Sequence, residues 1–227
     1  MFQGFTDATV DFMWGIRFNN ERSWFEAHKE EYRTAFQAPM RDLAQEVYEH
    51  MRAREAEGST LTVKVSRIYK DARCLHGQGP YRDHLWFSIQ SPSEQWSAAP
   101  CFWFELAPEH WSCGLGYYMA RPVTMARLRA RMDARPEPML RLQRALARRP
   151  ELVLEGEEYK KPRSAPSHPE LEVWYRKKNF SIRHEEKLNE TVFSRAIVTE
   201  LEETFDFLLP YYRYFATLDG DPDPRMV

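Results

Sequence analysis

The chain lacks two features that would narrow its function at once: an excess of basic charge and a long apolar run. Its 32 Lys and Arg residues are balanced by 34 Asp and Glu residues, which gives a formal net charge of −2 at pH 7. This balance provides no general attraction for nucleic acid. A membrane-spanning helix needs roughly 18 to 20 consecutive apolar residues, and no such run occurs. We therefore expect neither nucleic acid nor a membrane as a partner.

Cysteine is scarce, and the familiar catalytic motifs are missing. Cys74, Cys101 and Cys113 show no CxxC spacing, which predicts reduced thiols rather than disulfides or a metal site. The N-terminus has no basic and apolar segments of a secretory signal, and there is no GxSxG, HExxH or GxGxxG motif. We expect a cytoplasmic protein with no metal and no cofactor. No motif decides whether it is an enzyme or what its oligomeric state is.

What the chain does contain is enough apolar surface for a folded core, because 43% of its residues are hydrophobic and 14% are aromatic. In residues 1–58 apolar side chains recur at helical spacing. One such series is Met40, Leu43, Val47 and Met51. The pattern predicts three helices, over residues 7–19, 20–36 and 39–55.

Alternating apolar and polar residues follow in residues 59–120, as is typical of half-buried strands. Leu61, Val63 and Val65, for example, alternate with polar neighbours. The short polar turns between such runs indicate antiparallel neighbours. The predicted strands cover residues 61–68, 84–90, 101–106 and 113–119.

Residues 121–227 contain helical patterns again and are expected to complete the same domain. Prolines bound two predicted helices, the Pro-rich segment 151–184 indicates short strands with a turn of helix, and apolar spacing predicts a final helix. The three helices are placed at 123–133, 138–148 and 188–208. The fold predicted for residues 1–227 is a single α+β domain, with N-terminal helices and a C-terminal helix packed on a central antiparallel sheet.

Arg67 occupies a position where the alternation of the first strand predicts an inward-facing apolar side chain. A buried guanidinium needs a carboxylate, phosphate or carbonyl partner. Arg67 could therefore mark an anion site, or it could pair with Asp71 or Asp83. A third alternative is that the strand simply ends at Ser66.

The loop that follows Arg67 collects further cations. Lys70, Arg73 and Arg82 lie in residues 69–84, and Gly77, Gly79 and Pro80 can shape a fixed turn between them. An arginine side chain presents a planar fork that matches carboxylate or phosphate. We expect Arg67, Arg73 and Arg82 to converge, although acidic residues of the loop could neutralise them.

Two glycines, Gly114 and Gly116, fall on one face of the last predicted strand. Missing side chains at such positions permit either close packing of a helix or a trough above the sheet. Trp86 and Trp103 lie on the non-core face of their strands, so a trough would have aromatic walls.

Arginine is concentrated between residues 121 and 149, where nine arginines face only Asp133 and Glu137. Such a segment could bind a partner or nucleic acid. It could equally pair with the acidic residues predicted in the final helix, which would leave little free positive charge.

Several motifs together resemble a family of bacterial and fungal proteins catalogued as domain of unknown function 2461. They are Gly4-Phe5, the run Asn19 to Phe25, Tyr32, Arg67 to Arg73, Pro80 to His84, Lys161-Pro162-Arg163, His168-Pro169 and Lys177 to Phe180. The resemblance covers nearly the whole chain and implies one compact α+β unit with no established activity. The chain departs from the family pattern at Cys74 to Gln78 and at Ser164-Ala165, so a site that depended on those side chains would be altered.

The resemblance adds weight to the loop as a site for a small phosphate- or carboxylate-bearing ligand in a basic, aromatic-lined cleft. The predicted ligand-binding residues are Arg67, Lys70, Arg73, Tyr81, Arg82, His84 and Arg163. His84 is the candidate catalytic residue, because imidazole titrates near neutral pH. The alternatives are a non-catalytic interaction or nucleic-acid-binding module that uses the Arg-rich helices of 121–149, and a scaffold whose motif arginines form internal ion pairs.

Overall fold

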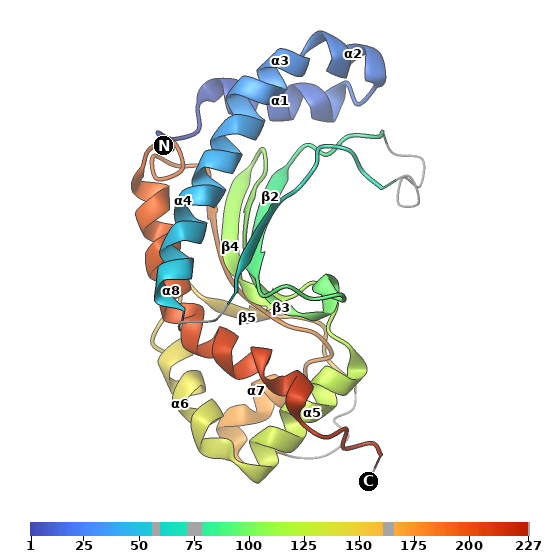
Figure 1. Cartoon of the computed structure of the whole chain (residues 1–227), viewed down its shortest axis with the longest axis vertical. Coiled ribbons are helices and arrows are strands. Elements are labelled where there is room, and N and C mark those ends of the chain that lie inside the picture. Colours follow the sequence, from blue (N-terminus) through green and yellow to red (C-terminus); the bar gives the residue numbers. More distant parts are fainter. Residues whose placement is uncertain (56–59, 72–78, 161–165, 227) are drawn as a thin grey trace. The chain divides into compact units, whose positions relative to one another are not determined.

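The structure is a computed structural model that describes residues 1–55, 60–71, 79–160 and 166–226 (Figure 1). The helical elements are α1 (Asp7–Phe18), α2 (Arg22–Ala27), α3 (Lys29–Glu31), the π-helix η1 (Tyr32–Gln37), α4 (Ala38–Arg54), η3 (Trp96–Ala98), α5 (Pro122–Ala134), α6 (Pro136–Leu146), η4 (Pro169–Leu171), α7 (Glu172–Tyr175), α8 (Ala196–Ala216) and η5 (Leu218–Gly220).

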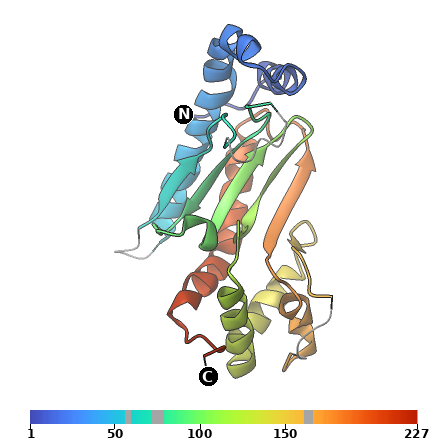
Figure 2. The ribbon, with the colours of Figure 1, turned by 90° about the vertical axis from the view of Figure 1, so that its right-hand side faces the viewer.

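The strands form one six-stranded antiparallel sheet in the order β1-β2-β3-β4-β6-β5. Their bounds are β1 (Thr62–Val65), β2 (Leu85–Gln90), β3 (Pro100–Leu106), β4 (His110–Tyr117), β5 (Val153–Glu155) and β6 (Ser181–Lys187). Figure 2 shows the strands side by side. The predicted α+β class and antiparallel sheet are confirmed.

The chain divides into two compact units, each built from discontinuous segments. Unit 1 comprises residues 1–89, 103–113 and 185–206, and unit 2 comprises residues 90–102, 114–184 and 207–227. The predicted single domain over 1–227, with its three sequence parts, stays a prediction.

In unit 1 the first helices are close to their predicted bounds, but residues 20–36 do not form one continuous α-helix. They comprise α2, α3 and most of the π-helical turn η1, which leads directly into α4. Pro39 lies in the first turn of α4, where a missing N–H costs least. The apolar stripe Met40, Leu43, Val47 and Met51 is fully buried, and α4 packs against β1.

The prediction for the last helix was wrong at its start, because α8 begins at Ala196 rather than near residue 188. Residues 189–194 form turns instead: the Val192 N–H donates to the Asn189 carbonyl, and the Asn189 side-chain oxygen accepts from the Thr191 N–H. Asparagine and threonine compete in this way with helical hydrogen bonds. Val192 is nevertheless fully buried, which explains its match to the apolar pattern. None of the helices in the described part of the chain combines the length and apolar character needed to cross a membrane.

In unit 2 the two glycines of β4 make room for the backbone of a neighbouring strand, not for a helix or a trough. A Cβ at Gly114 would collide with the Ile182 carbonyl oxygen, and a Cβ at Gly116 would lie 2.6 Å from the Phe180 carbonyl oxygen. The backbone at the start of β6 therefore fills the space that the missing side chains leave. Both interpretations of these glycines, close packing of a helix and an aromatic-walled trough, were wrong.

Beside β6, the short strand β5 pairs antiparallel, with Leu154 opposite Ile182. Much of the remaining core of unit 2 is aromatic. The rings of Trp174, Phe180 and Phe215 lie within 6 Å of one another, centroid to centroid. These contacts hold the end of α8 against α7.

Candidate functional site

Arg67 does not point into the core. β1 ends at Val65, the Ser66 N–H donates to the Trp86 carbonyl, and the Trp86 N–H donates to the Ser66 hydroxyl at 2.9 Å. This side-chain bond breaks the strand alternation, so Ser66 and Ile68 are buried and Arg67 is exposed. The prediction that Arg67 faces inward was therefore wrong. The alternative, a strand that ends near Ser66, describes the structure.

A short antiparallel ribbon carries the predicted loop. Tyr69 and Tyr81 form an isolated antiparallel bridge. On either side of it, the Lys70 N–H donates to the Pro80 carbonyl at 2.8 Å and the Arg82 N–H to the Ile68 carbonyl at 2.7 Å. We call residues 67–70 and 80–82 the ribbon. Arg67, Lys70 and Arg82 all belong to this ribbon, and the convergence of their side chains stays a prediction.

The α1–α2 connection holds the ribbon in place. The Asn20 side-chain oxygen accepts from the Tyr81 N–H and its amide nitrogen donates to the Tyr81 carbonyl, both at 2.9 Å. The Tyr81 ring is only 3% exposed and stacks on Phe25 at 4.4 Å. Burial raises the pKa of Tyr81 above its ordinary value. Tyr69, which is 50% exposed, is the outward-facing ring of the ribbon.

The Arg82 guanidinium is fixed by carbonyl oxygens rather than by a carboxylate. Its Nη1 donates to the Arg67 carbonyl at 3.1 Å and to the Tyr69 carbonyl at 2.5 Å. Within the described ranges, no carboxylate forms an ion pair with Arg67 or Arg82. Two uncompensated guanidinium groups therefore belong to the same ribbon. Two other predicted ligands, Arg73 and Arg163, lie outside the described residues.

Asp83, one of the two carboxylates predicted as a partner of Arg67, pairs with Arg17 instead. The Arg17 Nε donates to Asp83 Oδ2 at 2.5 Å, and the Arg17 Nη2 donates to Glu109 Oε2 at 3.1 Å. Sequence reasoning missed Arg17, because it lies 66 residues from Asp83 along the chain and looks like an ordinary charge near the end of a helix.

His84 lies between two carboxylates of unit 1. Its Nδ1 is 2.9 Å from Asp83 Oδ1, and its Nε2 is 4.0 Å from Glu105 Oε2. The hydrogen bond from His84, together with that from Arg17, holds the pKa of Asp83 well below its ordinary value. An ionised Asp83 requires a proton on His84 Nδ1 and so orients the imidazole, as in catalytic Asp–His pairs. A catalytic role for His84 stays a prediction.

No group of three His, Cys, Asp or Glu side chains in the described segments is arranged to hold a metal ion.

Several arginines of the Arg-rich segment form ion pairs within unit 2. Arg121 and Arg127 pair with Asp219, and Arg131 donates to Asp221 at 2.6 Å. On α6, Arg144 pairs with Glu170. These acidic partners lie in η5, directly after η5 and in η4.

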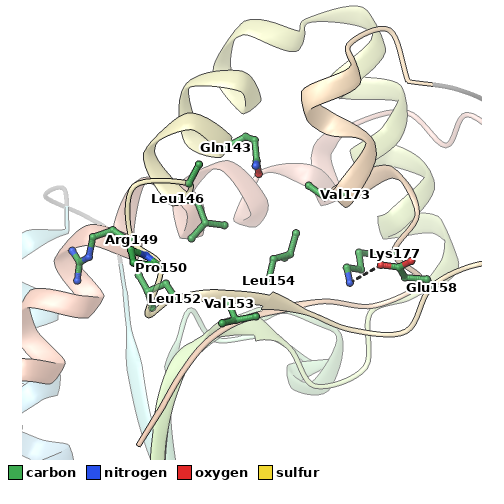
Figure 3. Close-up of a pocket in the computed structure, with 11 residues that line it drawn as sticks. Gln143, Leu146, Arg149, Pro150, Leu152, Val153, Leu154, Glu158, Val173 and Lys177 are labelled. Atoms are coloured by element: carbon green, nitrogen blue, oxygen red, sulfur yellow. Dashed lines mark hydrogen bonds and ion pairs between the residues drawn. The ribbon is translucent and has the colours of Figure 1, made fainter.

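Unit 2 contains a pocket of about 400 Å³ that the sequence did not predict (Figure 3). Its walls come from α6, β5, α7 and the segments that connect them. The lining residues are Gln143, Leu146, Ala147, Arg149, Pro150, Leu152, Val153, Leu154, Glu158, Val173 and Lys177. Because these residues come from two separate segments, 143–158 and 173–177, no single motif points to the pocket.

The architecture is that of an α+β protein with a six-stranded antiparallel sheet. Residues 8–214 match the family DUF2461, which is described as a conserved hypothetical protein. The chain belongs to this family, as its motifs predicted. A comparison with curated proteins found no match.

Proposed function

We propose that the protein binds a small phosphate- or carboxylate-bearing ligand at the ribbon of unit 1. The observation that carries this proposal is the pair of guanidinium groups at Arg67 and Arg82, which have no carboxylate partner among the described residues. Lys70 lies on the same ribbon and is the third proposed cation of the site. Arg73 and Arg163 stay predicted ligands.

The bonds of Arg82 support this function over a purely structural one. Only its Nη1 is used by the backbone carbonyls, whereas a guanidinium has five N–H donors. The remaining donors and the full positive charge are available to a ligand. Because Arg82 is held in place before a ligand arrives, little side-chain entropy is lost on binding.

The nature of the anion follows from the type of donor. Planar guanidinium forks match the paired oxygens of phosphate and carboxylate, and a phosphate monoester carries up to two negative charges at neutral pH. Two arginines favour the more highly charged group. We therefore propose a phosphate ester as the better ligand. The exposed Tyr69 ring offers an aromatic surface for the organic part of the ligand.

The test compares phenyl phosphate with benzoate by isothermal titration of the parent protein and three variants. Arg67→Gln and Arg82→Gln should each weaken phenyl phosphate binding at least tenfold, since a charge-assisted hydrogen bond contributes about 1.5–3 kcal/mol. Arg33→Gln is the matched control, because Arg33 is an exposed arginine of unit 1 that pairs with Glu30. It should bind as the parent does.

Benzoate should bind more weakly than phenyl phosphate. If the parent bound both ligands with equal affinity, the proposed preference for phosphate would be wrong and the ribbon would be a general anion site. If phenyl phosphate bound equally to the parent, Arg67→Gln and Arg82→Gln, the ribbon would not be the binding site.

A further inference from the structure

The pocket of unit 2 has apolar walls with a few polar groups among them. Leu146, Leu154 and Val173 point toward one another in Figure 3, and Lys177 and Glu158 close one side. A volume of about 400 Å³ lies within the range of small-molecule sites, which are also mainly apolar with few polar groups.

The first of these polar groups is the Lys177 ammonium. Its side chain is 10% exposed, and its Nζ donates to Glu158 Oε1 at 3.0 Å and to the Gly156 carbonyl at 3.3 Å. An ammonium group has three protons. Two protein acceptors therefore leave one N–H of Lys177 for a further acceptor at the pocket.

The second polar group is the Gln143 amide, whose orientation is decided by chemistry. The Trp174 indole N–H can only donate, and it donates to Gln143 Oε1 at 2.6 Å. The amide nitrogen of Gln143 must therefore be the other head-group atom. In the described part of the chain nothing accepts from it. Gln143 reaches the pocket from α6, on a different side from Lys177 (Figure 3).

The charged groups at the pocket form ion pairs. Glu158 is shared between Lys177 and Arg176, whose Nε lies 3.4 Å from Glu158 Oε2. Arg149, at the far end of the lining, pairs with Glu151. Arg176 also pairs with Glu172, at 3.8 Å between Nη1 and Oε1, so each cation beside the pocket has a carboxylate partner. What the pocket offers a ligand is therefore the remaining N–H of Lys177 and the amide N–H groups of Gln143.

We infer that this pocket is a second binding site, which takes a carboxylic acid with a small aliphatic body. The carboxylate accepts from Lys177 and from the Gln143 amide, and the aliphatic part contacts Leu146, Leu154 and Val173. The site lies entirely within unit 2 and is independent of the phosphate site proposed in unit 1.

The test uses hexanoate as the probe and methyl-labelled protein in two-dimensional NMR. Hexanoate should shift the methyl signals of Leu146, Leu154 and Val173 in a saturable way. Hexylamine, with a similar aliphatic chain and the opposite charge, should not. This part needs no variant and so does not depend on a variant that folds.

Lys177→Met should weaken hexanoate binding at least tenfold. Its matched control is Lys178→Met, because Lys178 is the next residue, pairs with Glu157 and does not line the pocket. Lys178→Met should bind as the parent does. The inference is overturned if hexanoate leaves these methyl signals unchanged, if hexylamine shifts them equally, or if Lys177→Met retains the parent affinity.

Discussion

Replacing Asp83 with asparagine tests the charge network that supports the ribbon. Asp83 accepts from Arg17 Nε at 2.5 Å and from His84 Nδ1 at 2.9 Å. Asparagine has nearly the same shape but no charge. The substitution therefore weakens both charge-assisted hydrogen bonds without opening a cavity.

The expected loss in the free energy of unfolding is about 2 kcal/mol at pH 7. Two charge-assisted hydrogen bonds would contribute about 1.5–3 kcal/mol each. The side chains of Arg17, Asp83 and His84 are 24–33% exposed, so solvent screening reduces the sum. Arg17 also keeps its second partner, Glu109.

The loss should depend on pH in a defined direction. The pKa of Asp83 is lowered in the folded protein, first by the hydrogen bond from His84 and then by Arg17. Its stabilising contribution is therefore complete above the unfolded-state pKa of about 3.9 and is lost as pH falls toward the lower folded-state pKa. The difference between the parent and Asp83→Asn should shrink as pH falls below about 4.

Urea unfolding at pH 7, 5, 4 and 3 measures this difference. Asp11→Asn is the control, since Asp11 is exposed and forms no ion pair in the described structure; it should stay within about 0.5 kcal/mol of the parent. A full loss that persisted unchanged at pH 3, or no loss at pH 7, would refute the reasoning.

Three further predictions concern other parts of the molecule. Gly114→Ala should destabilise the protein by about 2 kcal/mol or more, because its Cβ would meet the Ile182 carbonyl, whereas Gly220→Ala, with nothing within 4 Å, should be nearly neutral in urea unfolding. Arg131→Met should lower the free energy of unfolding by about 3 kcal/mol in the same assay, since the Arg131 side chain is 10% exposed and also donates to the Tyr214 carbonyl at 2.9 Å. The control Arg141→Met, at an exposed arginine, should change it little. Equal losses for the two variants would contradict the account. Burial raises the pKa of Cys101 to about 12 and also raises that of Cys113. Iodoacetamide at pH 8 should therefore label both thiols far more slowly in the native than in the unfolded protein. Equal labelling rates, measured by mass spectrometry, would contradict this prediction.

The elements with strict apolar spacing could be predicted from the sequence, whereas their ends often could not. Met40, Leu43, Val47 and Met51 follow the 3.6-residue period and are buried in α4. By contrast, Val192 follows the same period outside any helix, because the hydrogen bonds of Asn189 and Thr191 end the pattern locally. The periodicity of apolar residues indicates which side chains are buried, and a buried side chain need not lie in a helix.

Only those parts of the candidate site that lie close together in the sequence could be predicted. Arg67 and Arg82 lie 15 residues apart in the sequence, and the backbone hydrogen bonds of the ribbon bring their segments together. Nothing in the sequence showed that the Ser66 hydroxyl would replace a ladder bond of β1 and turn Arg67 outward. The partner of Asp83 was equally hidden, because Arg17 comes from a distant helix.

The most direct test of the central proposal observes the side-chain N–H signals of Arg67 and Arg82 by NMR while phenyl phosphate is added. Signals are assigned from the spectra of Arg67→Gln and Arg82→Gln. A phosphate bound at the ribbon should shift both Nε–H signals with one common dissociation constant and leave the Arg33 signal unchanged. Arginine signals of the ribbon that stay in place while phenyl phosphate saturates the protein would contradict the proposal.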